Sequence, residues 1–196
     1  MATLGLILSG GRSRRMGADK AFVSLDGRPL LAHALAALAP QCARLALSAN
    51  GDPAVYASFG APVLPDGVAN HAGPLAGVLA GLTFAAGRGC ATMATASVDS
   101  PFLPADFVAR LAAARPEGGI AVAASGGRTH WTNALWPVAG AEPVAAALAV
   151  ALAQGRNRME DFVQAFPCAV VTWAGDPFFN VNTPDDLAAA ERALTR

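Results

Sequence analysis

The sequence predicts a three-layer α/β protein, in which helices cover both faces of a doubly wound, mostly parallel sheet of the Rossmann-like kind. Its 196 residues suit one domain with a sizeable core, expected to span residues 1–196. Short β-type runs alternate with longer alanine-rich segments along the whole chain, and this alternation is typical of parallel strands joined by helices. No linker, internal repeat or low-complexity segment divides the sequence.

The individual elements follow from this alternation. Strands are expected at Leu4–Ser9, Arg44–Ala49, Pro62–Leu64, Ala91–Val98, Ile120–Ala124 and Ala169–Trp173. Helices are expected at Pro29–Ala39, Pro53–Phe59, Pro74–Ala86, Pro104–Ala114, Ala141–Ala153 and Pro184–Leu194, the second of them short. The last helix has a clear start signal, because Thr183 precedes Pro184 as an N-cap residue. Thr129–Pro137 breaks the alternation and is expected to be a strand or loop of a smaller excursion near the ligand pocket.

The charge balance excludes several classes of partner. Fourteen basic and fourteen acidic side chains cancel, and no basic run is longer than the pair Arg14-Arg15. Non-specific electrostatic binding to nucleic acid or to an anionic membrane is therefore not expected, and small molecules remain as the candidate ligands. Gly67 to Gly87 carries no formal charge, but its five glycines, Asn70, His71 and Pro74 argue against a membrane span.

The cysteines indicate a reducing compartment. Cys42, Cys90 and Cys168 lie far apart, so the sequence predicts neither a disulfide framework nor a structural metal site. The first residues lack the basic region of a signal peptide. We therefore expect a cytoplasmic protein.

The loop after the first strand is the first candidate ligand site, because ligands of doubly wound folds gather at the carboxyl ends of the strands. Its glycines let the backbone approach a phosphate, and Arg12, Arg14, Arg15 and Lys20 supply positive charge. Lys20 is the only lysine beside thirteen arginines. We interpret it as a phosphate ligand that needs a compact ammonium group, with a solvated surface lysine as the alternative.

Three further loops and one helix carry candidate site residues. Asp99 follows a buried strand and suits a hard Mg²⁺ ion carrying nucleotide phosphates, unless Asp99 or Ser100 only caps the next helix. Asp66 follows another strand and is either a ligand or part of an ordinary turn. Asn180 and Asn182 lie two apart, so in extended backbone they point to the same side. Glycines 73, 77 and 81 recur every fourth residue on an expected helix, which permits close approach to the sheet or to a base and ribose.

Taken in order, these motifs resemble those of the molybdenum cofactor guanylyltransferases over nearly the whole chain. They are Leu8-Ser9-Gly10-Gly11 with Arg15-Met16-Gly17 and Lys20, then Gly73-Pro74-Leu75-Ala76-Gly77, then Val98-Asp99-Ser100-Pro101, and last Asn180-Val181-Asn182-Thr183-Pro184. The first motif alone is shared by many sugar and cofactor nucleotidyltransferases. The resemblance implies a nucleotidyltransferase fold and transfer of GMP from GTP to molybdenum-loaded molybdopterin, with Mg²⁺ and release of diphosphate.

The resemblance also implies roles for individual residues. Leu8, Ser9, Gly10 and Gly11 would contact the guanine nucleotide, mainly through backbone groups. The other expected nucleotide-binding residues are Lys20, Ser48, Asn50, Asp66, Gly77 and Asp99, and the expected catalytic residues are Arg15, Lys20 and Asp99, with Asp99 as the metal ligand. Arg156, Arg158, Asn180 and Asn182 are the expected acceptor-binding residues, and molybdoenzyme maturation proteins are expected partners.

The chain departs from the family pattern at several positions. Ser9 stands where an alanine is usual, and Ser48-Ala49-Asn50 stands where many members have N-A-N. His130-Trp131-Thr132 stands where H-P-T is frequent, a change on the expected pterin side. Two other activities stay open: a related nucleotidyltransferase that moves CMP to molybdopterin or a nucleotide to a sugar phosphate, and a nucleotide-binding regulator without catalysis.

Overall fold

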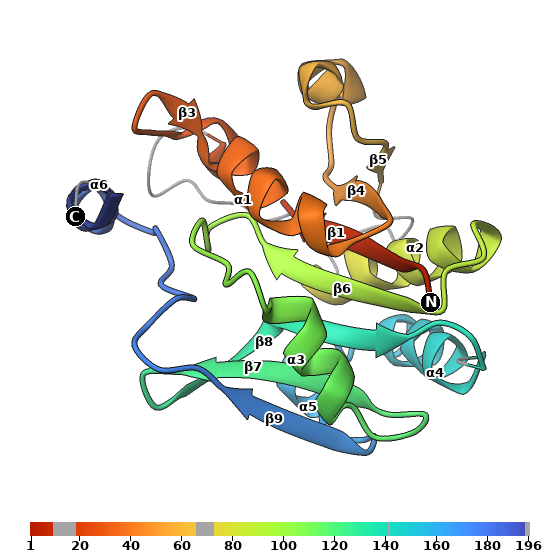
Figure 1. The fold of residues 1–196 in the computed structure, drawn as a ribbon. Helices are drawn as coiled ribbons and strands as arrows, with labels where there is room; N and C mark the ends of the chain where they lie inside the picture. Colours follow the sequence, from red (N-terminus) through yellow and green to blue (C-terminus); the bar gives the residue numbers. More distant parts are fainter. Residues whose placement is uncertain (10–18, 66–72, 141, 195–196) are drawn as a thin grey trace.

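A seven-stranded sheet forms the centre of the protein, in a computed structural model that describes residues 1–9, 19–65, 73–140 and 142–194 (Figure 1). The strand order is β5-β4-β1-β6-β8-β7-β9. The strands are β1 (Thr3–Leu8), β4 (Arg44–Ser48), β5 (Val63–Leu64), β6 (Thr92–Ser97), β7 (Ile120–Ser125), β8 (Arg128–Pro137) and β9 (Cys168–Thr172). All neighbours pair in parallel except β8, which runs antiparallel to both β6 and β7. The predicted fold class is confirmed.

Helices cover both faces of the sheet. On one face lie α1 (Leu30–Leu38) and α3 (Phe107–Ala114), and on the other lie α2 (Pro74–Gly87), α4 (Glu142–Ala153) and α5 (Met159–Val163) (Figure 1). Alternate residues of β1 supply the two cores: Leu6 packs in the α2 core and Ile7 in the α1 core, as the two-residue period of a strand requires. None of the helices in the described ranges is long and apolar enough to cross a membrane.

A smaller unit lies beyond the carboxyl ends of the strands. There α6 (Pro184–Leu194) packs against the two-stranded hairpin of β2 (Ser24–Leu25) and β3 (Arg28–Pro29). Leu25, Leu30, Val181 and Ala190 are buried together at this contact. The contact brings the segment before α6 close to the segment that contains Lys20. Three 3-10 helices complete the described structure: η2 (Lys20–Phe22), η3 (Ala39–Gln41) and η4 (Pro53–Phe59).

The structure differs from the sequence prediction most clearly at β8. We expected residues 129–137 in a smaller excursion, and this was wrong: β8 is a long strand inside the main sheet, between β6 and β7. Gly126 and Gly127 both have positive φ, which allows the tight two-residue turn that joins β7 to β8. The hairpin of β2 and β3 and the short helix α5 were not predicted. The helix expected from Pro104 begins at Phe107 as α3.

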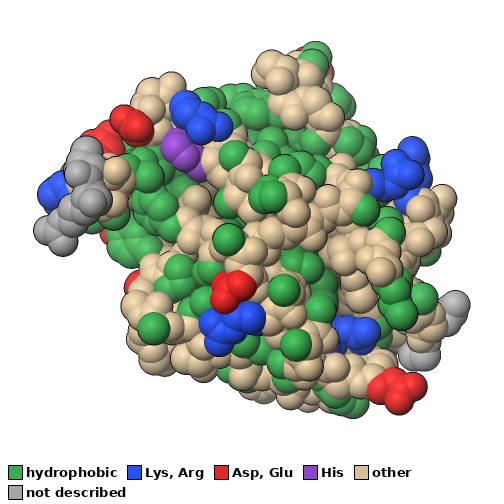
Figure 2. Space-filling model, in the orientation of Figure 1, with side chains coloured by type: hydrophobic (Ala, Val, Ile, Leu, Met, Phe, Trp, Pro, Cys, Tyr) green, Lys and Arg blue, Asp and Glu red, His purple; other side chains and the backbone are tan. Residues whose placement is uncertain are grey.

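The surface carries few charges. Figure 2 shows basic and acidic side chains scattered singly or in small groups over one face, among apolar and uncharged polar atoms. This agrees with charged residues making up 14% of the chain and a net charge of zero. The surface charge therefore does not point to a ligand site, and the site is sought among the polar side chains that cluster within the described residues.

Candidate active site

Three residues from distant parts of the sequence meet at the carboxyl edge of the sheet. The Lys20 ammonium lies 2.9 Å from Oδ2 of Asp99 and also donates a hydrogen bond to Oδ1 of Asn182. Lys20 and Asp99 expose only 13% and 17% of their side chains, so this ion pair is largely shielded from solvent. The interpretation of Lys20 as an indifferent solvated lysine is therefore wrong. The structure brings together three of the residues that the sequence singled out.

The second oxygen of the Asp99 carboxylate is also engaged. Ser97 donates its hydroxyl proton to Oδ1 at 2.6 Å, a distance typical of a charge-assisted hydrogen bond. The Asp99 and Ser100 side chains do not cap α3, whose N-cap residue is Asp106. The capping alternative for this loop is therefore wrong. Sequence reasoning missed Ser97, although a hydroxyl two residues before a strand-end aspartate was a usable signal.

The backbone around Lys20 is fixed by its neighbours. Asp19 caps η2, since its Oδ1 accepts a hydrogen bond from the Ala21 amide at 3.0 Å. The Tyr56 hydroxyl, on η4, donates to Oδ2 of the same carboxylate at 3.0 Å. Burial, with the Asp19 charge as the next cause, raises the pKa of Tyr56 to about 12. This tyrosine therefore stays a hydrogen-bond donor at neutral pH and ties the Lys20 segment to η4.

Asn180 and Asn182 reach the site from the segment that precedes α6. The Asn180 side chain lies 2.8 Å from the Ser100 hydroxyl, and with its amide turned to satisfy both ends it donates to Asp99 Oδ1 at 3.3 Å. The Val181 amide, between the two asparagines, donates to the Asp99 carbonyl at 2.9 Å. Both asparagine side chains therefore point toward Asp99 and its neighbours, which confirms the expectation that they lie on the same side of this segment.

The start of α6 holds this segment in place. Thr183 accepts from the Asp186 amide, and the Asp186 carboxylate accepts from the amides of Asn182 and Thr183, each at 2.9 Å. These two side chains cap the helix reciprocally, as the Thr183 signal predicted. The Asn182 amide, followed by the Thr183 hydroxyl, holds the pKa of the Asp186 carboxyl below its usual range.

The end of β1 lies between β4 and β6. The Ser9 amide donates to the Ser48 carbonyl at 2.9 Å, and the Leu8 carbonyl accepts from the Val98 amide at 3.1 Å. Ser48 is buried, whereas Asn50 is exposed at the same edge. The structure thus places Leu8 and Ser9 beside Ser48, with Asn50 two residues further along the chain, but the Leu8 carbonyl already accepts one hydrogen bond within the sheet.

The glycines of α2 allow that helix to approach the sheet closely. A Cβ atom on Gly77 would lie 2.1 Å from the Ser48 hydroxyl oxygen, and one on Gly81 would lie 2.5 Å from a methyl group of Leu6. Close packing on the sheet accounts for both glycines. A direct contact between Gly77 and a nucleotide stays a prediction.

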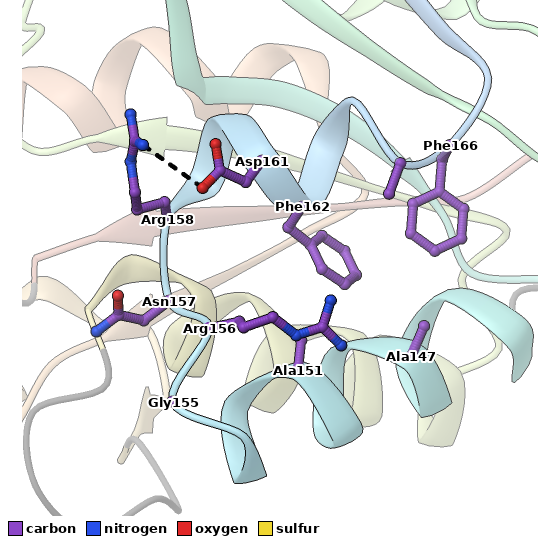
Figure 3. Close-up of a pocket in the computed structure, with 10 residues that line it drawn as sticks. Ala147, Ala151, Gly155, Arg156, Asn157, Arg158, Asp161, Phe162 and Phe166 are labelled. Atoms are coloured by element: carbon purple, nitrogen blue, oxygen red, sulfur yellow. Dashed lines mark ion pairs between the residues drawn. The ribbon is translucent and has the colours of Figure 1, made fainter.

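The expected acceptor-binding arginines lie on the loop between α4 and α5. This loop and the two helices line a cavity of about 450 Å³ whose apolar wall includes Ala151, Phe162 and Phe166 (Figure 3). Arg156 extends along α4 and donates to the Gln154 side chain, whereas Arg158, which also lines the cavity, turns toward α5 and lies 3.6 Å from Asp161. The loop adjoins the start of α2, because a Cβ on Gly73 would lie 3.7 Å from the Asn157 carbonyl.

A second polar cluster, which the sequence did not reveal, ties the C-terminal segment to the sheet: Ser125 and His130 are buried, and Asp176 is exposed. Ser125, at the end of β7, donates to Oδ1 of Asp176 at 2.7 Å and lies 2.9 Å from Nε2 of His130. Because the Ser125 hydroxyl proton is directed to Asp176, the serine oxygen accepts from Nε2 of His130. Burial, followed by the Arg128 charge, lowers the pKa of His130. Asp176 begins the turn that leads to Asn180. We interpret this cluster as an anchor for the segment that carries the two asparagines.

Four predicted site residues lie outside the described part of the chain. They are Gly10, Gly11 and Arg15 in the first loop and Asp66 in the segment after β5. The described residues contain no group of three His, Cys, Asp or Glu side chains that would form a metal site made by protein alone. A nucleotide-bound Mg²⁺ ion needs fewer protein ligands, because phosphates and water supply the others. The oxygens of Asp99 and Asn182 that meet at the Lys20 ammonium are of the hard type that Mg²⁺ prefers, so this donor set fits such an ion.

Comparisons with known proteins agree with this fold. Residues 5–171 match the model of the MobA-like NTP transferase domain. A molybdenum cofactor guanylyltransferase of Bradyrhizobium sp. (strain ORS 278) is 48% identical over 97% of this chain and 92% of its own. One from Cereibacter sphaeroides is 48% identical over 100% of this chain and 99% of its own.

Two solved structures show the same fold at low sequence identity. Molybdopterin-guanine dinucleotide biosynthesis protein A from Archaeoglobus fulgidus superposes with a TM-score of 0.73 at 22% identity, covering 98% of both chains. The 2-C-methyl-D-erythritol 4-phosphate cytidylyltransferase from Thermus thermophilus superposes with a TM-score of 0.69 at 23% identity, covering 97% of this chain and 98% of that chain. The family match and the full-length relatives lead to one conclusion: the chain belongs to the MobA-like NTP transferase family.

Proposed function

We propose that this protein transfers GMP from GTP to molybdenum-loaded molybdopterin, which yields the molybdopterin guanine dinucleotide cofactor and diphosphate. The names of its full-length relatives support this reaction. The observation that carries the proposal is the meeting of Lys20, Asp99 and Asn182 at the carboxyl edge of the sheet. That edge is where doubly wound folds bind nucleotides.

The reaction is a direct displacement. An oxygen of the acceptor's terminal phosphate forms a bond to the α-phosphorus of GTP while the bond to the leaving diphosphate breaks in line. A phosphate is already ionised at neutral pH, so the step needs no protein nucleophile and no general base. The protein's task is to hold two polyanions close together and offset their repulsion.

Named residues divide this task. Lys20 neutralises the phosphates of the nucleotide, assisted by Arg15 and by the backbone amides of Gly10 and Gly11, and Asp66 binds the nucleotide. Asp99 and Asn182 are the residues that would hold Mg²⁺. When bound, this ion stabilises negative charge on the α-phosphate and on the leaving diphosphate. Ser97 orients the Asp99 carboxylate from the side away from Lys20.

The acceptor is bound from the opposite side of the nucleotide. Arg156 and Arg158 supply cations to the acceptor phosphate, and Asn180 and Asn182 position the segment between the two substrates. The Arg156 side chain supports this role best, since its only hydrogen-bond partner within the described ranges is the neutral Gln154. We expect the protein to act in the cytoplasm, where its three free thiols stay reduced, and to pass its product to molybdoenzyme maturation proteins.

Selection for guanine follows from hydrogen bonding. Guanine offers an N1–H and an amino group as donors and O6 as an acceptor, so its recognition needs protein acceptors together with a backbone N–H. We expect the end of β1 and the segment after β4 to supply them. A site built in this way rejects a base that leaves buried polar groups unpaired by a large factor.

Competition between nucleotides tests the proposal. The protein is incubated with molybdenum-loaded molybdopterin and equal amounts of GTP, CTP and ATP, and the dinucleotide products are identified by mass spectrometry. We expect the guanine product to predominate. Equal or better use of CTP would reject guanylyl transfer in favour of a related nucleotidyltransferase. Absence of any product and of diphosphate release would favour a nucleotide-binding regulator.

A further inference from the structure

The Lys20 ammonium occupies a position suited to a compact cation. Its nitrogen is held between a carboxylate oxygen of Asp99 and the amide oxygen of Asn182. Both oxygens belong to segments fixed by other contacts: the Asp99 backbone by Val181, and the Asn182 backbone by Asp186. The two acceptors therefore stay in place whether the cation between them is an ammonium group or a metal ion.

Only one oxygen of the Asp99 carboxylate faces this position. Oδ1 accepts the short hydrogen bond from Ser97, and Asn180 lies against the same oxygen. Oδ2 has Lys20 as its partner within the described residues. A cation that binds Asp99 in this arrangement must therefore use the oxygen that Lys20 already holds.

We propose that Lys20 and a divalent cation are alternative occupants of the Asp99 Oδ2 position. In the nucleotide-free protein Lys20 holds the position and excludes the metal. Nucleotide phosphates draw the ammonium away, and the metal that accompanies them then binds Asp99 and Asn182. This inference rests on the proposed function to the extent that a nucleoside triphosphate is the ligand that releases Lys20.

The exchange needs movement of only one side chain. The backbone at Lys20 is anchored by the cap at Asp19 and by the buried Tyr56 behind it. The lysine stem has four flexible carbons, so rotation about its bonds moves the ammonium while the backbone stays. A monovalent and a divalent cation a few Å apart in a partly buried site repel strongly, which makes joint occupancy unfavourable.

Manganese binding without any nucleotide tests the exclusion. Mn²⁺ is titrated into the wild-type protein and into Lys20→Met, which removes the charge at nearly constant shape, and free Mn²⁺ is measured by electron paramagnetic resonance. We expect Lys20→Met to bind one Mn²⁺ roughly tenfold or more tightly than the wild type, as removal of a competing cation requires. Asp99→Asn in the Lys20→Met background should abolish this gain.

The matched control is Arg88→Met, which removes an exposed cation at the end of α2 and should leave Mn²⁺ binding at the wild-type level. Equal Mn²⁺ affinity of the wild type and Lys20→Met would overturn the proposal, as would tight Mn²⁺ binding that survives Asp99→Asn. This measurement contains neither nucleotide nor acceptor, so its result does not depend on whether GTP is the substrate.

A second measurement uses the unaltered protein and covers the case in which Lys20→Met does not fold. Because Lys20 is the only lysine, protein labelled with ¹³C at the lysine ε-carbon gives a single side-chain NMR signal. Addition of Mg²⁺ alone should leave this signal in place, whereas addition of GTP should shift it. A shift caused by Mg²⁺ alone at a concentration near that of the protein would overturn the exclusion.

Discussion

Two cationic regions of the molecule differ in how distant their partners are in sequence and in how exposed they are. Lys20 is joined to residues 79 and 162 positions away in sequence, and its ion pair with Asp99 is largely shielded from solvent. Arg158, on the loop between α4 and α5, leaves 72% of its side chain exposed and forms ion pairs with Glu160 and Asp161 of its own segment. The first region exists only when the whole chain has folded, whereas the second is almost entirely local.

This difference bears on what each region contributes to a reaction. Charges in a site that is already largely shielded from solvent act on one another strongly, so they can stabilise a transition state strongly. Exposed, locally paired arginines are screened by water, and ordering them costs entropy. We therefore expect substitutions around Lys20 to impair turnover greatly and substitutions in the α4–α5 loop to affect acceptor binding modestly.

The largest effect is expected for Asp99→Asn. The substitution keeps the shape of the side chain and its place beside Ser97, but it removes the charge that faces Lys20 and the metal. Transfer of GMP should fall roughly 10²-fold or more, on the scale of losing a major electrostatic stabiliser. Steady-state kinetics at several Mg²⁺ concentrations measure this, with thermal unfolding as the check on the fold. Near-normal turnover with unchanged metal dependence would assign Asp99 a purely structural role.

Lys20 substitutions come next. Lys20→Ala should weaken GTP binding and turnover together, because the phosphates lose their main buried counter-charge. Lys20→Arg should fail as well, since a planar guanidinium does not fit the point between Asp99 and Asn182 that a compact ammonium fills. GTP affinity by calorimetry and single-turnover rates separate the two effects. If the arginine variant works as well as the parent, any cation serves at this position.

How much of this could be predicted from sequence depends on how local the signal is. The alternation of short and long apolar segments correctly predicts the parallel strands and their helices, because each element buries its own face. It fails at β8, where an antiparallel strand enters the middle of the sheet through a Gly-Gly turn, a pairing that local pattern does not encode. It also misses the hairpin of β2 and β3, whose strands are two residues each.

The candidate site likewise contains residues that local sequence signals identify and residues that only long-range contacts identify. Lys20, Asp99 and Asn182 were identifiable by residue type and by their place after strands, and the structure shows that they meet. The partners that hold them were not identifiable in this way. Ser97, Tyr56 and the cluster of Ser125, His130 and Asp176 act through contacts between distant segments, so only the folded arrangement reveals them.

A smaller effect is expected for Gly77→Ala, which tests whether the buried side of the site depends on close packing. The new methyl group would overlap Ser48, so the free energy of unfolding should fall by about 1–3 kcal/mol, the usual cost of overpacking. Thermal or urea unfolding measures this. Gly87→Ala is the matched control on the same helix, because open space surrounds that position and only the helix propensity of alanine acts there. A neutral Gly77→Ala together with a neutral control would show that α2 can shift outward without cost.

The smallest effects on turnover are expected in the α4–α5 loop. Arg156→Ala removes the guanidinium beside the cavity lined by Phe162 and Phe166, and should raise KM for the acceptor several-fold while leaving KM for GTP unchanged. Arg158→Ala should have a still smaller effect, since its charge is already shared with Glu160 and Asp161 and such exposed pairs contribute only about 0–1 kcal/mol. Initial rates with each substrate varied in turn separate the two constants. A large loss of GTP binding in Arg156→Ala would mean that this loop belongs to the nucleotide side, and the contrast between a buried catalytic region and an exposed acceptor region would then be wrong.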